Sequence, residues 1–203
     1  RITNQTLGSN MDFYDDRNLV LDSCNVLMGA NARILIAANN TLTITNGTHL
    51  HACNEMWEGI LAGEPGSKIV LNNKAIIEDA VNALDIVNGH YEISDATLTR
   101  NLRHIRINNS DDPGTIVSSR LICPETLNSP HENQYSETGI DAFNVKTFLI
   151  GAPSKGNIFE NASNGINWLA DQFLPEGTRS ITLRNNTFRN TSSLAGTGIA
   201  VYV

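Results

Sequence analysis

A short apolar motif, often opened by glycine, recurs along most of the chain. Successive copies lie 24, 21, 35, 26 and 33 residues apart. Strand-sized units that return every ~20 to 35 residues are typical of a solenoid, in which the strands keep their register while the turns absorb insertions. The copies are centred on Ile60, Leu84, Ile105, Ile140, Ile166 and Ile199.

Two further short strands follow most copies of the motif. After Ile60 come the segments 67–71 and 75–79, which alternate apolar with polar residues and are bounded by turn-forming residues. Three short strands per repeat, with no helical stretch between them, predict a right-handed parallel β-helix of about six coils stacked at about 4.8 Å. A β-sandwich is the alternative, but it gives no reason for the same motif to recur.

Asparagine is abundant, with 26 of the 203 residues, and much of it falls at the expected strand ends. Asparagine tolerates left-handed backbone angles and suits tight turns. Stacked asparagine side chains also form amide ladders along a coil. We therefore expect turn and ladder roles for Asn72, Asn73, Asn88, Asn101, Asn108, Asn109, Asn161, Asn185, Asn186 and Asn190.

Two segments carry a resemblance to a known family. Residues 56–60 (Met-Trp-Glu-Gly-Ile) and 76–80 (Ile-Ile-Glu-Asp-Ala) resemble right-handed β-helix modules of the pectate-lyase-like superfamily, most closely those in large secreted proteins of the Bacteroidetes. The resemblance covers roughly residues 30 to 203. It implies the fold but no single activity, because the superfamily includes lyases and glycosidases as well as adhesins and non-catalytic modules.

The composition agrees with an extracellular or cell-surface protein. The formal net charge is −7, and no basic cluster is present, which disfavours nucleic acid as a partner. No apolar run approaches the ~18 residues that a membrane helix needs. The chain has no signal peptide and stops on a strand-like segment, 198–203, without a polar cap, so we expect a mature protein or a piece of a longer one.

Residues 1–203 are expected to form one domain. Residues 1–30 fit the repeat poorly and are expected to be irregular, with 12–16 either a leading loop or the tail of an earlier coil. Asp12, Asp15 and Asp16 lack the spacing of a calcium loop, which favours a solvated acidic turn. Residues 108–138 are interpreted as one enlarged coil with long loops.

The three cysteines lead to different expectations. Cys24 and Cys53 are 29 residues apart, about one coil, so they are expected to stack and form a disulfide. Cys123 lies in an apolar run and is expected to be a buried free thiol. The chain has no C-x-x-C pair and its histidines are scattered, which disfavours a zinc site.

Strand alternation provides the best candidate site. If the central residue of each motif points inward, its two neighbours point outward. Asp85, Arg106 and Asp141 then occupy consecutive coils, with His104 beside Arg106, and loops 109–114 and 125–137 are expected to wall this cluster. The outward columns are Leu61, Asp85, Arg106, Asp141, Asn167 and Ala200 after the central residue, and Gly59, Ala83, His104, Gly139, Gly165 and Gly198 before it.

The superfamily resemblance implies one reading of this cluster. Pectate lyases place calcium-binding acids and a basic proton abstractor on such a sheet, which would make Asp85 and Asp141 calcium ligands and Arg106 the base. The chain has no recognisable lyase signature, and it lacks the Asn-x-Asp, Asp-Asp and His-Gly set of polygalacturonases. An ion-pair ladder is favoured instead, in which each pair contributes ~0.2 to 1 kcal/mol.

Aromatic residues are the usual contacts for sugar rings, but Trp57 and Trp168 are assigned to the core. Tyr14, Tyr135 and Phe143 are better surface candidates, and Asn167 joins them as a possible ligand contact. No cofactor is expected, apart from the calcium that the two carboxylates would allow.

The sequence favours a non-catalytic structural or adhesive module of a secreted or cell-surface bacterial protein, which presents a sheet to glycans or proteins. The enzyme alternative is a polysaccharide lyase or glycosidase acting on an acidic polysaccharide. The third is an extracellular filament subunit that associates end to end through its open coils, unless further coils of the same chain cover them.

Overall fold

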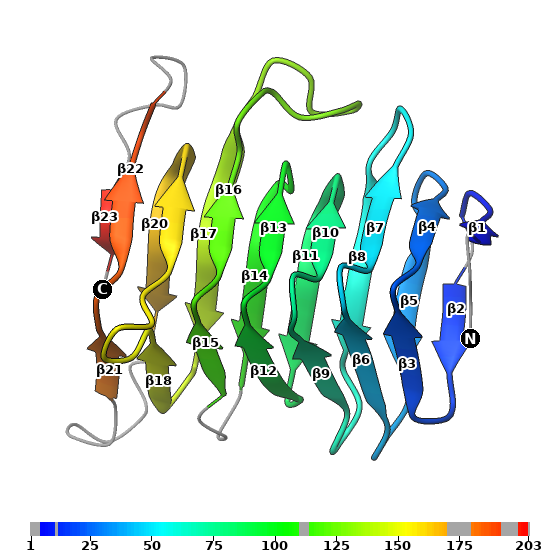
Figure 1. Ribbon diagram of the computed structural model, residues 1–203, viewed down its shortest axis with the longest axis horizontal. Helices are drawn as coiled ribbons and strands as arrows, with labels where there is room; N and C mark the ends of the chain where they lie inside the picture. Colours follow the sequence, from blue (N-terminus) through cyan, green and yellow to red (C-terminus); the bar gives the residue numbers. More distant parts are fainter. Residues whose placement is uncertain (1–4, 11, 110–113, 170–179, 192–198, 203) are drawn as a thin grey trace.

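A computed structural model of the chain describes residues 5–10, 12–109, 114–169, 180–191 and 199–202. In these residues the chain forms β-strands and no helix, and three parallel sheets wind into a solenoid (Figure 1). The chain passes through the three sheets, here called A, B and C, in that order and then begins the next coil. Each strand therefore stacks on the strand three places earlier in the chain. This confirms the predicted parallel β-helix with three strands per coil.

The strands of each sheet are short. Sheet A contains β1 (Gln5–Leu7), β4 (Asn25–Met28), β7 (His49–Ala52), β10 (Ile76–Glu78), β13 (Thr97–Thr99), β16 (Arg120–Ile122), β19 (Ile158–Glu160) and β22 (Thr187–Arg189). Sheet B contains β2 (Asp12–Asp15), β5 (Arg33–Ile36), β8 (Trp57–Ala62), β11 (Ala80–Val87), β14 (Arg103–Asn108), β17 (Ser136–Phe143), β20 (Ala162–Leu169) and β23 (Ile199–Tyr202). Sheet C contains β3 (Leu19–Asp22), β6 (Thr41–Thr45), β9 (Lys68–Leu71), β12 (His90–Ser94), β15 (Thr115–Val117), β18 (Thr147–Ile150) and β21 (Ser180–Leu183).

The recurring motif forms a buried column on sheet B. Neighbouring copies pair in register, and each central side chain is at most 1% exposed: Ile60, Leu84, Ile105, Ile140 and Ile166. The column is therefore confirmed. Ile34, which no glycine precedes, also joins it through its pairing with Ile60.

The last copy of the motif was assigned to the wrong residue. Val201, not Ile199, pairs with Ile166, and Ile199 pairs with Asn164. The two candidates are two residues apart, so both satisfy the period of a strand, and periodicity alone cannot choose between them. The residue that pairs with Asn167 is accordingly Tyr202 and not Ala200.

The first segment of the chain belongs to the solenoid. Of the two interpretations of residues 12–16, the earlier coil is correct, because β2 pairs along its length with β5. Asp12 forms an ion pair with Arg33 at 3.0 Å. The strands β1 to β4 thus extend all three sheets into a region that was expected to be irregular.

Asparagine closes many of the turns, as predicted. Five of the expected residues have φ between 49° and 57°: Asn73, Asn88, Asn109, Asn161 and Asn185. Amide-to-amide hydrogen bonds also link successive coils, for example from Asn157 Nδ2 to Asn186 Oδ1 at 3.0 Å. The stacked turns therefore satisfy one another's polar groups.

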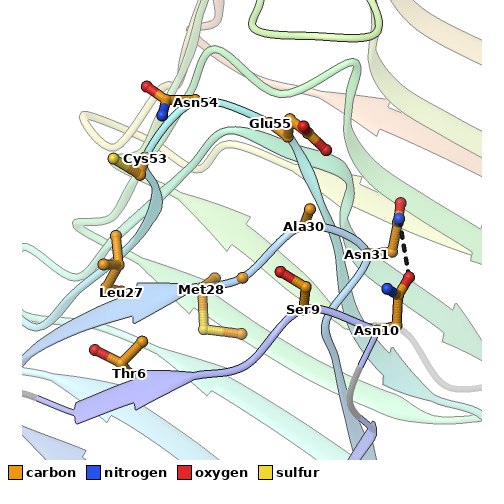
Figure 2. A pocket seen from close by; sticks show the side chains of 11 residues that line it. Thr6, Ser9, Asn10, Leu27, Met28, Ala30, Asn31, Cys53, Asn54 and Glu55 are labelled. Atoms are coloured by element: carbon orange, nitrogen blue, oxygen red, sulfur yellow. Dashed lines mark hydrogen bonds between the residues drawn. The ribbon is translucent and has the colours of Figure 1, made fainter.

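The predicted disulfide is wrong, because all three cysteines are free. Cys24 precedes β4 and is aligned with Thr48, whose hydroxyl lies 3.7 Å from its sulfur. Cys53 follows the far end of β7, five residues and about 16 Å further along the strand direction. It borders a hollow that Leu27 and Glu55 also line (Figure 2). The two cysteines therefore lie in adjacent coils, as their spacing predicts, but at opposite ends of the stacked strands β4 and β7.

The enlarged coil has its own small core. Cys123 is fully buried, as predicted, and packs in a cluster with Met56, Leu102 and Leu127. The loop after β16 runs back along the solenoid, where Met56 N donates to Ser129 O at 2.8 Å (Figure 1). Both tryptophans are in the main core, as expected: Trp57 is 0% and Trp168 is 8% exposed.

Candidate functional site

The register of sheet B brings the predicted polar residues into one outward row. Asp85 pairs with Arg106, Arg106 with Asp141, and Asp141 with Asn167, each from the next coil. All four side chains are half-buried. Because paired strands lie about 4.8 Å apart, the row is a continuous polar stripe across four coils.

The groups of this stripe are largely bonded to one another. Arg106 Nη1 lies 3.5 Å from Asp85 Oδ2, and Asn167 Nδ2 donates to Asp141 Oδ1 at 2.8 Å. Burial raises the pKa of the Asp85 carboxyl despite the opposing effect of Arg106. Its other oxygen, Oδ1, has no hydrogen-bond partner among the described residues.

His104 does not belong to this surface, which corrects its assignment as a candidate beside Arg106. It is fully buried, and Asn101 Nδ2 donates to its Nδ1 at 3.2 Å. His104 and Ile105 are buried in succession, which interrupts the alternation of β14. The paired strand β11 shows the same interruption at Ala83 and Leu84, and its own register with β8 shifts between Asn82 and Leu84. An irregularity of this kind turns the preceding side chain to the other face. The whole column before the central residue is accordingly buried from Gly59 to Gly165, with Gly198 outside the described residues.

The buried imidazole predicts a specific pH dependence of stability. Burial lowers the pKa of His104 to about 3. The unfolded chain protonates this group below pH ~6.5 while the folded chain does not, so stability is lost as pH falls. His104→Gln keeps a polar group but removes the titration. Between pH 7 and pH 5 the native protein should lose about 2 kcal/mol more than the variant. Equal losses in urea unfolding at the two pH values would contradict the assignment.

A hollow of about 210 Å³ adjoins the stripe at the carboxyl end of the strands. Phe143 and Leu169 pair across adjacent coils and are 43% and 41% exposed. Phe143 thus points outward beside Asp141, as predicted. Asn108 and Leu169 were not predicted as site residues, although both lie two residues after members of the stripe and so share its face. The hollow is lined by Arg106, Ile107, Asn108, Asp141, Phe143 and Leu169.

The long loop lies elsewhere. A separate cleft at the amino end of the sheet B strands is lined by Leu102, Arg103, His131, Asn133, Gln134, Tyr135, Glu137 and Ser163. Tyr135 contributes to this cleft and packs against the small core, so it does not share a site with Phe143. Arg103 Nη2 forms an ion pair with Glu137 at 2.6 Å there. Of the other expected wall, residues 110–113 lie outside the described part of the chain.

The polar stripe offers little to a calcium ion. Arg106 lies between Asp85 and Asp141 in the register, so an ion held by both carboxylates would have to displace the guanidinium. Within the described ranges, no group of three or more His, Cys, Asp or Glu side chains is placed to hold a metal ion.

No family model, curated protein or solved structure matches the chain. In the described residues no helix is long and apolar enough to cross a membrane. A functional proposal for the chain therefore rests on its own structure, which is a parallel β-solenoid with a polar stripe and a shallow hollow on sheet B.

Proposed function

We propose that the protein is a non-catalytic module of a secreted or cell-surface bacterial protein, and that it presents the outer face of sheet B to a glycan. The hollow beside Phe143 is the observation that carries this proposal. It combines an exposed aromatic ring with the guanidinium of Arg106, the amide of Asn108 and the carboxylate of Asp141. Sites that bind small polar ligands combine apolar surface with a few convergent polar groups in this way.

The chemistry of these groups suits a sugar. The ring of Phe143 offers an apolar face to the C–H groups of a pyranose. Asp141 accepts hydrogen bonds, and Arg106 and the amide nitrogen of Asn108 donate them, which matches hydroxyl groups that donate and accept. The solenoid holds these groups on stacked strands, so binding requires little ordering of the protein.

The bonding of the stripe supports a binding role over catalysis. A lyase would need Arg106 to accept a proton, but a guanidinium has no acceptor group in proteins, and Arg106 instead forms an ion pair with Asp85. Asp141 is likewise engaged by Asn167. The flanking of Arg106 by two carboxylates is the feature that keeps a polysaccharide lyase or glycosidase as the alternative function.

Phe143→Ala is expected to weaken glycan binding at least about tenfold, because a central aromatic contact in an interface commonly contributes 2 kcal/mol or more. Tyr14→Ala is the matched control, since Tyr14 is an exposed aromatic residue on the same sheet, at 58%. Titration of both variants with a panel of neutral and acidic oligosaccharides tests this expectation. Equal glycan affinities of the native protein and Phe143→Ala would mean that the binding site lies elsewhere.

A further inference from the structure

Two histidines lie side by side on the outer face of sheet A, away from the hollow on sheet B. His49 and His51 alternate with buried residues along β7, so both side chains point outward. Their ring centroids are 4.6 Å apart, with a tilt of 32° between the ring planes. The two imidazoles are therefore close enough to act on the same ligand.

Each ring already has one nitrogen bonded to an acceptor. His49 Nε2 lies 2.7 Å from Glu78 Oε2, and His51 Nδ1 lies 3.2 Å from the carbonyl oxygen of Ala52. A carboxylate and a carbonyl oxygen only accept hydrogen bonds, so the ring nitrogens that face them donate. In the neutral imidazoles, His49 Nδ1 and His51 Nε2 then carry the lone pairs. Histidines that bind metals are fixed in this way, by a carboxylate or a backbone carbonyl on the opposite nitrogen.

The surroundings of the pair favour a cation. Glu78, Asp79 and Glu125 surround Arg100, with N–O distances of 3.1, 2.9 and 2.7 Å. Three carboxylates against one guanidinium leave a formal charge of −2. Burial raises the pKa of the Asp79 carboxyl to about 6, so this charge is present at neutral pH. A local negative charge raises the concentration of cations near the histidines.

We infer that His49 and His51 bind a divalent late transition-metal ion, for which Zn²⁺ and Cu²⁺ are the probes. Imidazole is a preferred ligand of both ions, with metal–nitrogen distances of about 2.0–2.1 Å for Zn²⁺. The ring centroids are 4.6 Å apart, and rotation of the two half-buried side chains is what brings both lone pairs to one ion. No third His, Cys, Asp or Glu of the described residues joins them in a metal-binding group, so water completes the coordination. Glu78 acts as a positioning residue, because it holds His49 with one oxygen and Arg100 with the other.

The test is calorimetric titration of the full chain with ZnCl₂ and CuCl₂ at pH 7. The exposed thiol of Cys53 can bind the same ions, so the titration is run on the native protein and on Cys53→Ser. Both should take up one ion at this site. His49→Asn and His51→Asn, each made in Cys53→Ser, should abolish that binding, whereas His131→Asn should leave it unchanged.

Glu78→Gln separates a positioning role from a merely structural one. Loss of such an outer partner typically weakens metal binding by about 10- to 100-fold, and the affinity is compared only for variants whose circular dichroism shows the native fold. Absence of binding to Cys53→Ser would overturn the proposal. So would binding that survives in His51→Asn, or that Glu78→Gln leaves unaltered.

Discussion

Gly59→Ala is expected to destabilise the protein by ~4 kcal/mol or more, or to prevent it from folding. A Cβ atom at this position would lie 1.6 Å from the carbonyl oxygen of Asn82 in the next coil. The backbone φ of Gly59 is also 118°, which L-residues rarely adopt. Neither problem is relieved by moving a side chain, because the obstacle is the backbone of the neighbouring strand.

Gly47→Ala is the control for this substitution. Gly47 also has a positive φ, 71°, but nothing lies within 4 Å of a Cβ built there. It should lose only the ~1 to 2 kcal/mol of left-handed backbone strain. Urea unfolding followed by circular dichroism compares the two variants. Similar losses of unfolding free energy in the two variants would mean that the backbones of Gly59 and Asn82 do not approach as closely as described.

Asn101→Ala is expected to cost about 3 kcal/mol or more. The buried amide of Asn101 accepts from Ala80 N at 2.8 Å and donates to Ile77 O at 3.0 Å. It also donates to His104 Nδ1. Removal of the amide leaves these buried groups without partners, and each such loss costs ~1 to 3 kcal/mol.

Asn54→Ala is the matched control for Asn101→Ala, because Asn54 is exposed and should change stability by no more than ~0.5 kcal/mol. Urea unfolding measures both variants, and hydrogen exchange of the Ala80 amide reports the local effect. Slow exchange at Ala80 in Asn101→Ala would show that the side chain does not hold this turn.

The fold was predictable because its repeating unit is visible in the chain. Ile60, Leu84 and Ile105 share a motif, and stacking of parallel strands turns that repetition into a buried column. The same register placed Asp85, Arg106 and Asp141 in one outward row. Once the central residue was known to face inward, every second residue after it followed.

The errors have a common cause, because periodicity does not record local irregularities. His104 was placed outside on the assumption of a regular strand, and the succession of two buried residues reversed it. Cys24 and Cys53 are about one coil apart, but their positions at opposite strand ends decide that they do not meet. Periodicity also does not predict the direction of a long loop. The segment that includes Tyr135 lies beside Leu102 and not beside Arg106.

The histidine pair of β7 was missed for a different reason. His49 and His51 are two residues apart, which places them on one strand face, but their partners come from other segments. Glu78 is supplied by the next coil, and the carboxylates around Arg100 come from two segments, Glu78 and Asp79 at the end of β10 and Glu125 in the loop after β16. Only the three-dimensional arrangement shows that each ring has one nitrogen held and one available.

The most direct measurement of the proposed function follows binding and product formation in the same samples. The native protein and Phe143→Ala are titrated with acidic and neutral polysaccharides in the presence of calcium, and unsaturated sugars and new reducing ends are measured in each mixture. We predict saturable binding that Phe143→Ala weakens, with no product from any polysaccharide. Release of unsaturated sugars by the native protein, abolished in Arg106→Ala with the fold intact, would contradict the account and identify a lyase.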